Sequence, residues 1–181
     1  MIADPVAIAR ALAREAGLAG GDRMPDGGPG GAADGDPDRD DLSLGGVRLV
    51  TVGVGWATVE LARAAVELGL HDPGGAIGPA EPDLLLGASA WTWRPDSPAP
   101  VLVLLEPGTE GRLAAALAHR GEGPAVLYLL PSEGLARGVE ALAASGIRCR
   151  RGRGPFGEAA LVLGRPVAGP QLILVGVPSG A

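Results

Sequence analysis

The sequence contains no lysine and no asparagine, and only 3% of its 181 residues are aromatic. All 15 of its basic residues are therefore arginines, against 21 acidic residues, which gives a formal net charge of −6 at pH 7. Binding to nucleic acid requires clustered cations, so we expect no nucleic-acid partner. Because 46% of the residues are hydrophobic but few are aromatic, the core must consist of leucine, valine and alanine.

Cysteine is also nearly absent. Cys149 is the only one, so an internal disulfide and a cysteine zinc site are both excluded, and this residue is interpreted as a small hydrophobe in a strand. The N-terminal stretch "MIADPVAIARALAREAG" contains acidic residues and no long apolar run. It therefore resembles neither a signal peptide nor a membrane span, and we expect a cytoplasmic protein with no membrane partner.

A short helix is predicted over residues 4–17, where Asp4 suits the cap, Pro5 the first turn and Gly17 the end. Residues 19–45 then lose all periodicity and are rich in glycine, aspartate and proline, which predicts a flexible linker. A phosphate-binding loop is the alternative for this stretch. No strand precedes it and no GK[ST] follows it, so the alternative is not supported.

The chain is thus divided into an N-terminal helix (1–18), the linker (19–45) and one folded domain (46–181). Within the domain, strands are predicted from short apolar runs and helices from apolar residues at helical spacing. The predicted strands are 47–57, 83–93, 100–107, 125–130, 147–153, 157–164 and 170–177; the predicted helices are 58–69, 109–121 and 132–146. One further strand, around 74–82, is only weakly marked.

The strand–helix unit occurs twice, with "LAR" at 61 and again at 135. In the first helix the apolar stripe is assigned to Val59, Ala62 and Val66; in the second it contains Leu135, Val139 and Leu142, among others. Three strands follow each helix, whereas a doubly wound sheet requires strict alternation of strands and helices. We therefore predict an α+β fold in which two tandem βαβββ modules form a curved, cup-shaped mixed sheet. Module one is 46–108, the connecting helix is 109–121 and module two is 122–181.

Two short motifs extend this pattern: "LLEP" at 104–107 and "RGEG" at 120–123, with a helix between them. In order and spacing, residues 47–177 resemble the vicinal oxygen chelate superfamily, which includes glyoxalase I, bleomycin-resistance proteins and methylmalonyl-CoA epimerase. The resemblance implies a divalent metal in the cup, held by histidine, glutamine or glutamate side chains on four strands.

The four implied ligand positions are Thr51, Val103, Ala125 or Val126, and Leu174. Three of them are hydrocarbon and the fourth is a hydroxyl, so we expect neither a metal nor another cofactor.

The two histidines of the sequence do not form a replacement cluster of metal ligands. His71 and His119 are isolated from one another in the predicted elements, and a solvated or capping role is the simpler interpretation.

Without a metal, the cup is expected to bind a small, mostly apolar molecule. The predicted ligand-binding residues are Thr51, Trp56, Trp91, Trp93 and Tyr128, because aromatic rings on strands lining a concave sheet suit a flat ligand. Trp91 and Trp93 share one face of their strand. The alternative is that these aromatics fill the core or a dimer interface.

Catalytic residues remain unassigned. Glu106 is a possible base, Glu158 begins a strand, and Arg94 suits either a ligand carboxylate or a surface turn. No pair of a nucleophile and a base is visible.

The leading hypothesis is therefore a metal-free, glyoxalase-like binding protein whose partners are a small-molecule ligand and, in a homodimer, a second copy of the chain. The alternative is an epimerase, isomerase or lyase acting on an acyl thioester or a secondary metabolite, which requires a buried ionisable group facing the cup. A third hypothesis is a structural module that binds a partner through its sheet edges.

Overall fold

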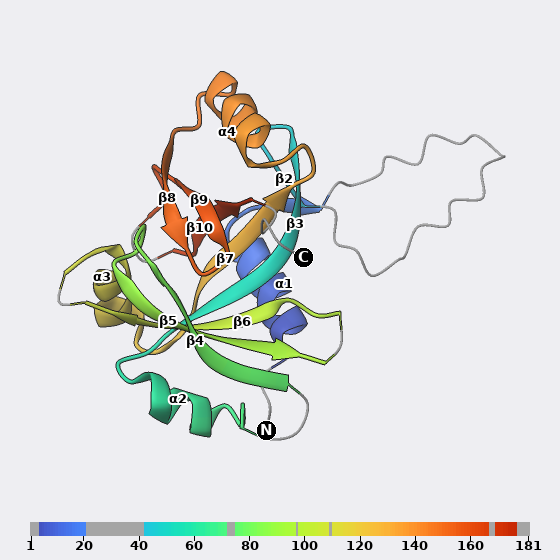
Figure 1. Cartoon of the computed structure of the whole chain (residues 1–181). Coiled ribbons are helices and arrows are strands. Elements are labelled where there is room, and N and C mark those ends of the chain that lie inside the picture. Colours follow the sequence, from blue (N-terminus) through green and yellow to red (C-terminus); the bar gives the residue numbers. More distant parts are fainter. Residues whose placement is uncertain are drawn as a thin grey trace, which may run out of the picture.

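The computed structural model describes residues 4–20, 42–71, 75–96, 98–108, 110–166 and 169–176 (Figure 1). The helices in these ranges are α1 (Pro5–Glu15), α2 (Leu61–Glu67), α3 (Arg112–Arg120) and α4 (Leu135–Ala144). The strands are β1 (Ala19–Gly20), β2 (Leu42–Leu44), β3 (Val47–Ala57), β4 (Gly75–Asp83), β5 (Ala88–Pro95), β6 (Val101–Pro107), β7 (Gly123–Pro131), β8 (Cys149–Gly154), β9 (Gly157–Val162) and β10 (Gln171–Val175).

The ten described strands form one mixed sheet, in which eight follow the order β4-β5-β6-β3-β7-β10-β9-β8 and contain the predicted pair of modules. Strand β2 pairs with β3 outside this order. In module one β3 runs parallel to β6, and in module two β7 runs parallel to β10. The antiparallel pairing of β3 with β7 joins the two modules at the centre of the sheet. Both modules therefore pair within one chain, and the predicted α+β fold is confirmed.

The sheet curls until its two edge strands come close to each other. The backbone N–H of Leu84, just after β4, donates to the carbonyl of Arg153 in β8 at 3.0 Å. The Arg153 side chain also contacts Glu81 of β4 at 3.4 Å. This curl gives the sheet a concave face and an opposite face, called here the helix-covered face because α1, α2 and α4 pack on it (Figure 1).

Helix α1 begins and packs as its sequence predicts. The Asp4 carboxylate accepts the backbone N–H of Val6 at 2.9 Å, and Pro5 occupies the first turn. The buried side of α1 lies against the helix-covered face of β3 and β7, with Leu12 among its buried residues. Of the predicted linker, the first residues form β1 and residues 42–44 form β2, which pair with each other. Residues 21–41 lie outside the described ranges.

Helix α2 presents a different stripe from the one predicted. Leu61, Ala64 and Ala65 are buried against the sheet, whereas Val59 is 60% exposed and Val66 is 68% exposed. The sequence of α2 is apolar on more than one side, so packing decided which side faces the sheet. In α4 the predicted stripe is correct, since Leu142 is fully buried with Leu135 and Val139 packed beside it.

The strand predicted over 83–93 is interrupted by a turn. Strand β4 ends at Asp83, whose carboxylate accepts the backbone N–H groups of Leu85 and Leu86, both at 3.0 Å. This local hydrogen bonding favours a turn over an extended strand. Gly87 closes the turn with a φ of 67°.

No helix in the described ranges is long and apolar enough to cross a membrane.

Candidate functional site on the concave face

The concave face is filled by side chains from most strands of the sheet. Fully buried residues of this cluster include Val103, Leu105, Val126, Leu161 and Ile173. Leu85 and Leu86, from the turn after β4, fold in over them. Side chains of the chain itself therefore occupy much of the expected cup.

One ionisable pair lies inside this apolar cluster. The Tyr128 hydroxyl on β7 donates to Oδ2 of Asp83 on β4 at 2.8 Å, and both residues are fully buried. Because β4 and β7 are not neighbours in the sheet, this hydrogen bond crosses the concave face.

Burial dominates the electrostatics of the pair. Loss of water raises the pKa of the Asp83 carboxyl, and hydrogen bonds from Tyr128 and from the backbone of Leu86 and Leu85 oppose this shift only in part. Burial, together with the nearby Asp83 charge, raises the pKa of Tyr128 well above its usual range. The pair is thus a weakened acid hydrogen-bonded to a hydroxyl that does not ionise near neutral pH.

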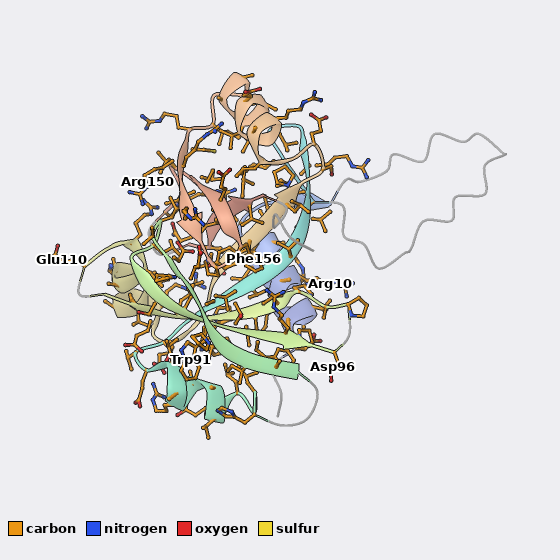
Figure 2. All side chains as sticks on the ribbon, in the orientation of Figure 1. Arg10, Trp91, Asp96, Glu110, Arg150 and Phe156 are labelled. Atoms are coloured by element: carbon orange, nitrogen blue, oxygen red, sulfur yellow. The ribbon has the colours of Figure 1, made fainter. Side chains whose placement is uncertain are left out.

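Phe156, in the turn between β8 and β9 (Figure 2), packs against Tyr128 of this pair. Its ring centroid is 5.0 Å from that of Tyr128, with the two planes at 52°. The ring also requires a glycine below it, since a Cβ on Gly53 would lie 2.6 Å from Cζ of Phe156. Gly55 is equally restricted, because a Cβ there would lie 2.7 Å from Cβ of Val126. Both glycines of "VGVGW" therefore serve close packing on the concave face.

The three tryptophans lie on the opposite side of the sheet from the one predicted. Trp56, Trp91 and Trp93 all pack in the cluster on the helix-covered face. Trp91 and Trp93 pair with Leu104 and Leu102 of β6, which belong to the same cluster. The expectation that these rings line the cup is therefore wrong, and Tyr128 is the predicted aromatic that does face it.

Thr51 also faces away from the cup, because a β-bulge changes the alternation of β3. Thr51 pairs with Leu129, whose side chain is on the helix-covered face, whereas Gly53 pairs with Tyr128. The register shifts between these two residues, so Val52 is the extra residue of the bulge. The sequence-based alternation missed this shift.

The residues at the metal positions of the family do not fit a divalent cation. Leu174, like Thr51, is on the helix-covered side, and the inward positions Val103 and Val126 offer only hydrocarbon. Across the described ranges, no group of three or more His, Cys, Asp or Glu side chains is placed to hold a metal ion.

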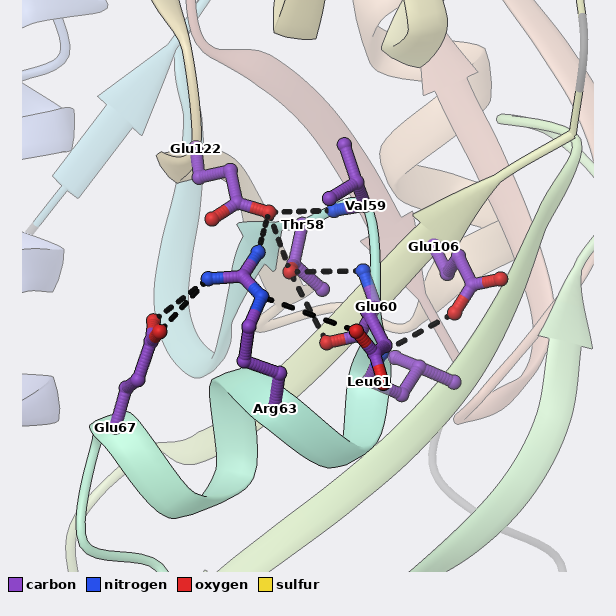
Figure 3. A network of polar contacts seen from close by, with 8 residues as sticks. All are labelled: Thr58, Val59, Glu60, Leu61, Arg63, Glu67, Glu106 and Glu122. Atoms are coloured by element: carbon purple, nitrogen blue, oxygen red, sulfur yellow. Dashed lines mark hydrogen bonds and ion pairs between the residues drawn. The ribbon is translucent and has the colours of Figure 1, made fainter.

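A polar network lies outside the concave face, at the start of α2 (Figure 3). Arg63 donates to Glu67 at 2.8 Å and to Glu122 at 2.6 Å. The Glu122 carboxylate also accepts the Thr58 hydroxyl at 2.8 Å and the Val59 N–H at 2.7 Å. The "RGEG" segment is thereby tied to α2.

The donors around Glu122 set its acidity. The hydrogen bond from Arg63, followed by those from Val59 and Thr58, lowers the pKa of Glu122 to about 2. The same carboxylate, helped by Glu67, raises the pKa of Arg63. In this network the spacings of Arg63 to Glu60 and to Glu67 are local sequence signals, whereas Glu122 is 59 positions from Arg63.

Neither Asp83 nor its partnership with Tyr128 was predicted. The available signal was an aspartate followed by three leucines and a glycine, "DLLLG", which suits a turn with its own carboxylate cap. A purely local pattern does not reveal a partner 45 positions away.

The similarity of this chain to known proteins lies in its structure. No family model matches the sequence, and no curated protein matches it. Solved structures do match. Methylmalonyl-CoA epimerase from Mycobacterium tuberculosis has a TM-score of 0.60 at 21% identity, covering 70% of this chain and 87% of the epimerase.

Two further structures show the same fold. A variant of the methylmalonyl-CoA epimerase of Streptomyces coelicolor, in complex with 2-nitronate-propionyl-CoA, has a TM-score of 0.58 at 21% identity, covering 72% of this chain and 99% of that one. A hypothetical protein from Bacillus halodurans has a TM-score of 0.55 at 15% identity, covering 70% and 92%. This chain thus has the same fold as methylmalonyl-CoA epimerase, one of the proteins named in the sequence resemblance.

Proposed function

We propose that this chain is an enzyme of the epimerase, isomerase or lyase type that moves a proton on a small acyl thioester. The observation that carries the proposal is the buried Asp83–Tyr128 pair on the concave face. An ionisable group in that position is what the enzyme hypothesis requires. The epimerases that share this fold, one of them in complex with 2-nitronate-propionyl-CoA, support the choice of substrate class.

The proposed base is Asp83. A carboxylate whose pKa is raised by burial binds a proton more tightly than an exposed one, so it is better suited to remove a proton from carbon. The C–H bond next to the thioester carbonyl breaks, the proton passes to Oδ2 of Asp83, and the electron pair moves to the carbonyl oxygen. The Tyr128 hydroxyl then donates to that enolate oxygen instead of to Asp83. Return of the proton to carbon restores the thioester. The configuration at this carbon is inverted when the enolate presents its other face to the proton.

Phe156 controls access in this proposal. The pair is fully buried, whereas Phe156 is only partly buried and its ring contacts that of Tyr128. Substrate reaches Asp83 when this ring swings out of the concave face, so the ring occupies the substrate position in the closed form.

The direct test is exchange of the α-proton of propionyl-CoA or methylmalonyl-CoA in D2O, followed by mass spectrometry. We expect the wild-type protein to catalyse exchange, Asp83→Asn to reduce it at least 100-fold, and Tyr128→Phe to reduce it about tenfold. Glu81→Gln is the matched control, because Glu81 is exposed on the same strand and contacts Arg153 instead of Tyr128. Equal exchange by wild type and Asp83→Asn would contradict the proposal.

A second candidate is the metal-free binding protein of the leading sequence hypothesis. It is favoured by one observation: the buried cluster on the concave face consists mostly of hydrocarbon side chains. This candidate predicts that a small apolar ligand raises the melting temperature while no α-proton exchange occurs. Elemental analysis of the purified protein tests both candidates, since a stoichiometric divalent metal would contradict the metal-free enzyme and the metal-free binding protein alike.

A further inference from the structure

We propose that a cleft between α3 and the end of β6 binds a small apolar molecule carrying a positive charge, of the alkylammonium or arylammonium class. The inference is independent of the enzyme proposal, because the residues that line this cleft do not include Asp83, Tyr128 or Phe156.

The size and lining of the cleft suit such a molecule. Its volume is about 390 Å³, and small-molecule sites typically begin at about 300 Å³. Its hydrocarbon walls come from Pro107 at the end of β6 and from Ala114, Leu117 and Ala118 of α3. Val59, which is 60% exposed, stands at the rim. Burial of these surfaces gives an apolar ligand its affinity.

Glu106 is the only charged side chain among the lining residues. Its Oε2 accepts the backbone N–H of Leu61 at 3.2 Å, which fixes the carboxylate at the wall. Figure 3 shows its other oxygen pointing away from the polar network around Arg63. Within the described ranges that oxygen makes no hydrogen bond or ion pair, so it remains available to a ligand.

The surrounding charges favour a cation over an anion. The guanidinium of Arg63 is already shared by Glu67, Glu122 and Glu60, at 2.8, 2.6 and 3.9 Å. It therefore does not neutralise Glu106.

The two arginines of α3 are directed elsewhere. Arg112 donates to Gln171 and to the carbonyl of Arg165, and Arg120 forms an ion pair with Glu15 of α1. Among the described residues no cation pairs with Glu106, and a carboxylate beside hydrocarbon is then best paired by a ligand ammonium group, while a ligand carboxylate is repelled.

The experiment is calorimetric titration of the full chain with three probes of equal length: hexylammonium, hexanol and hexanoate. We expect hexylammonium to bind at least tenfold more tightly than hexanol, and hexanoate to bind more weakly than either. Glu106→Gln should weaken hexylammonium at least tenfold and leave hexanol within twofold. This variant keeps the shape of the side chain and an oxygen for the Leu61 N–H, so it is expected to fold.

Two controls separate this site from general effects. Glu110→Gln makes the same charge change at an exposed position just before α3 and should leave hexylammonium binding within twofold. Ala118→Leu fills the cleft and should weaken hexylammonium and hexanol alike. Asp83→Asn should leave binding unchanged, so failure of the enzyme proposal does not affect this test. Equal binding of hexylammonium and hexanol to the wild type, or equal losses in Glu106→Gln and Glu110→Gln, would overturn the inference.

Discussion

The two modules differ in the way their equivalent hairpins enter the concave face. At the end of β4, module one contributes the Asp83 carboxylate, which accepts a hydrogen bond from Tyr128 in the first strand of module two. After β8, module two contributes the Phe156 ring, which packs over Gly53 in the first strand of module one. Gly53 and Tyr128 are paired neighbours across the β3–β7 junction.

Each module thus reaches across the junction to the other, once with a polar contact and once with an apolar one. A hydrogen bond accepted by a buried carboxylate is directional and sensitive to protonation, whereas the packing of a ring in a glycine-lined space depends on volume. The same hairpin position can therefore fix the curl of the sheet by either kind of force. The following variants separate the two.

The largest effect is expected from Asp83→Ala. The variant leaves the Tyr128 hydroxyl and two backbone N–H groups buried without an acceptor, which should reduce the free energy of unfolding by about 3–5 kcal/mol. Urea denaturation followed by tryptophan fluorescence measures the change. Glu81→Ala, which removes an exposed ion pair, should cost less than about 1 kcal/mol. Similar losses in the two variants would mean that the buried pair does not hold the hairpin.

The apolar contact should respond to volume. Phe156→Ala is expected to cost about 2 kcal/mol, less than a fully buried phenylalanine, because its ring is partly exposed. Gly53→Ala should cost about 1–3 kcal/mol in the wild type through overpacking against the ring, and much less when Phe156 is already alanine. A double-mutant cycle measures this coupling. Additive losses would show that the ring and the glycine act separately.

The polar contact should also depend on pH. Because the pKa of Asp83 is raised in the folded protein, its contribution to stability is fully present below the unfolded value near 3.8 and is lost as pH rises through the folded value. Asp83→Asn keeps the shape but does not titrate. We therefore expect the melting temperature of Asp83→Asn to rise relative to that of the wild type between pH 4 and pH 7. A fall in the melting temperature of the variant relative to that of the wild type over this interval would contradict the raised pKa.

The smallest effect concerns the helices of the two modules. Helix α2 is held by Glu122, whereas α4 begins after Gly134 with no side-chain cap. Glu122→Gln should lower stability by about 1 kcal/mol at pH 7. Since the pKa of Glu122 is lowered, this loss is present above about 4.5 and disappears as pH falls toward about 2. Thermal melts at pH 2 and pH 7 measure it, with Glu133→Gln near the start of α4 as the control. A loss of the same size at both pH values would exclude the ion pair as its cause.

Much of the fold could be predicted because its signals are local. Alternation of apolar residues marked β3 at its observed bounds, and repeated strand–helix units identified the modules. The same reasoning succeeded for the stripe of α4 and failed for that of α2, where apolar residues lie on more than one side. The candidate site was less accessible to prediction. Its polar pair joins residues 45 positions apart, and its position on β4 depends on a turn inside an apolar run.

The sequence by itself determined that the chain forms two βαβββ modules and that leucine, valine and alanine build the core. Only the tertiary structure decided which side of each strand faces the cup. Period-two alternation separates the residues of a strand into two faces but does not say which face is concave. A single extra residue at Val52 moves Thr51 to the helix-covered side, while the curl of the sheet brings Asp83 to Tyr128.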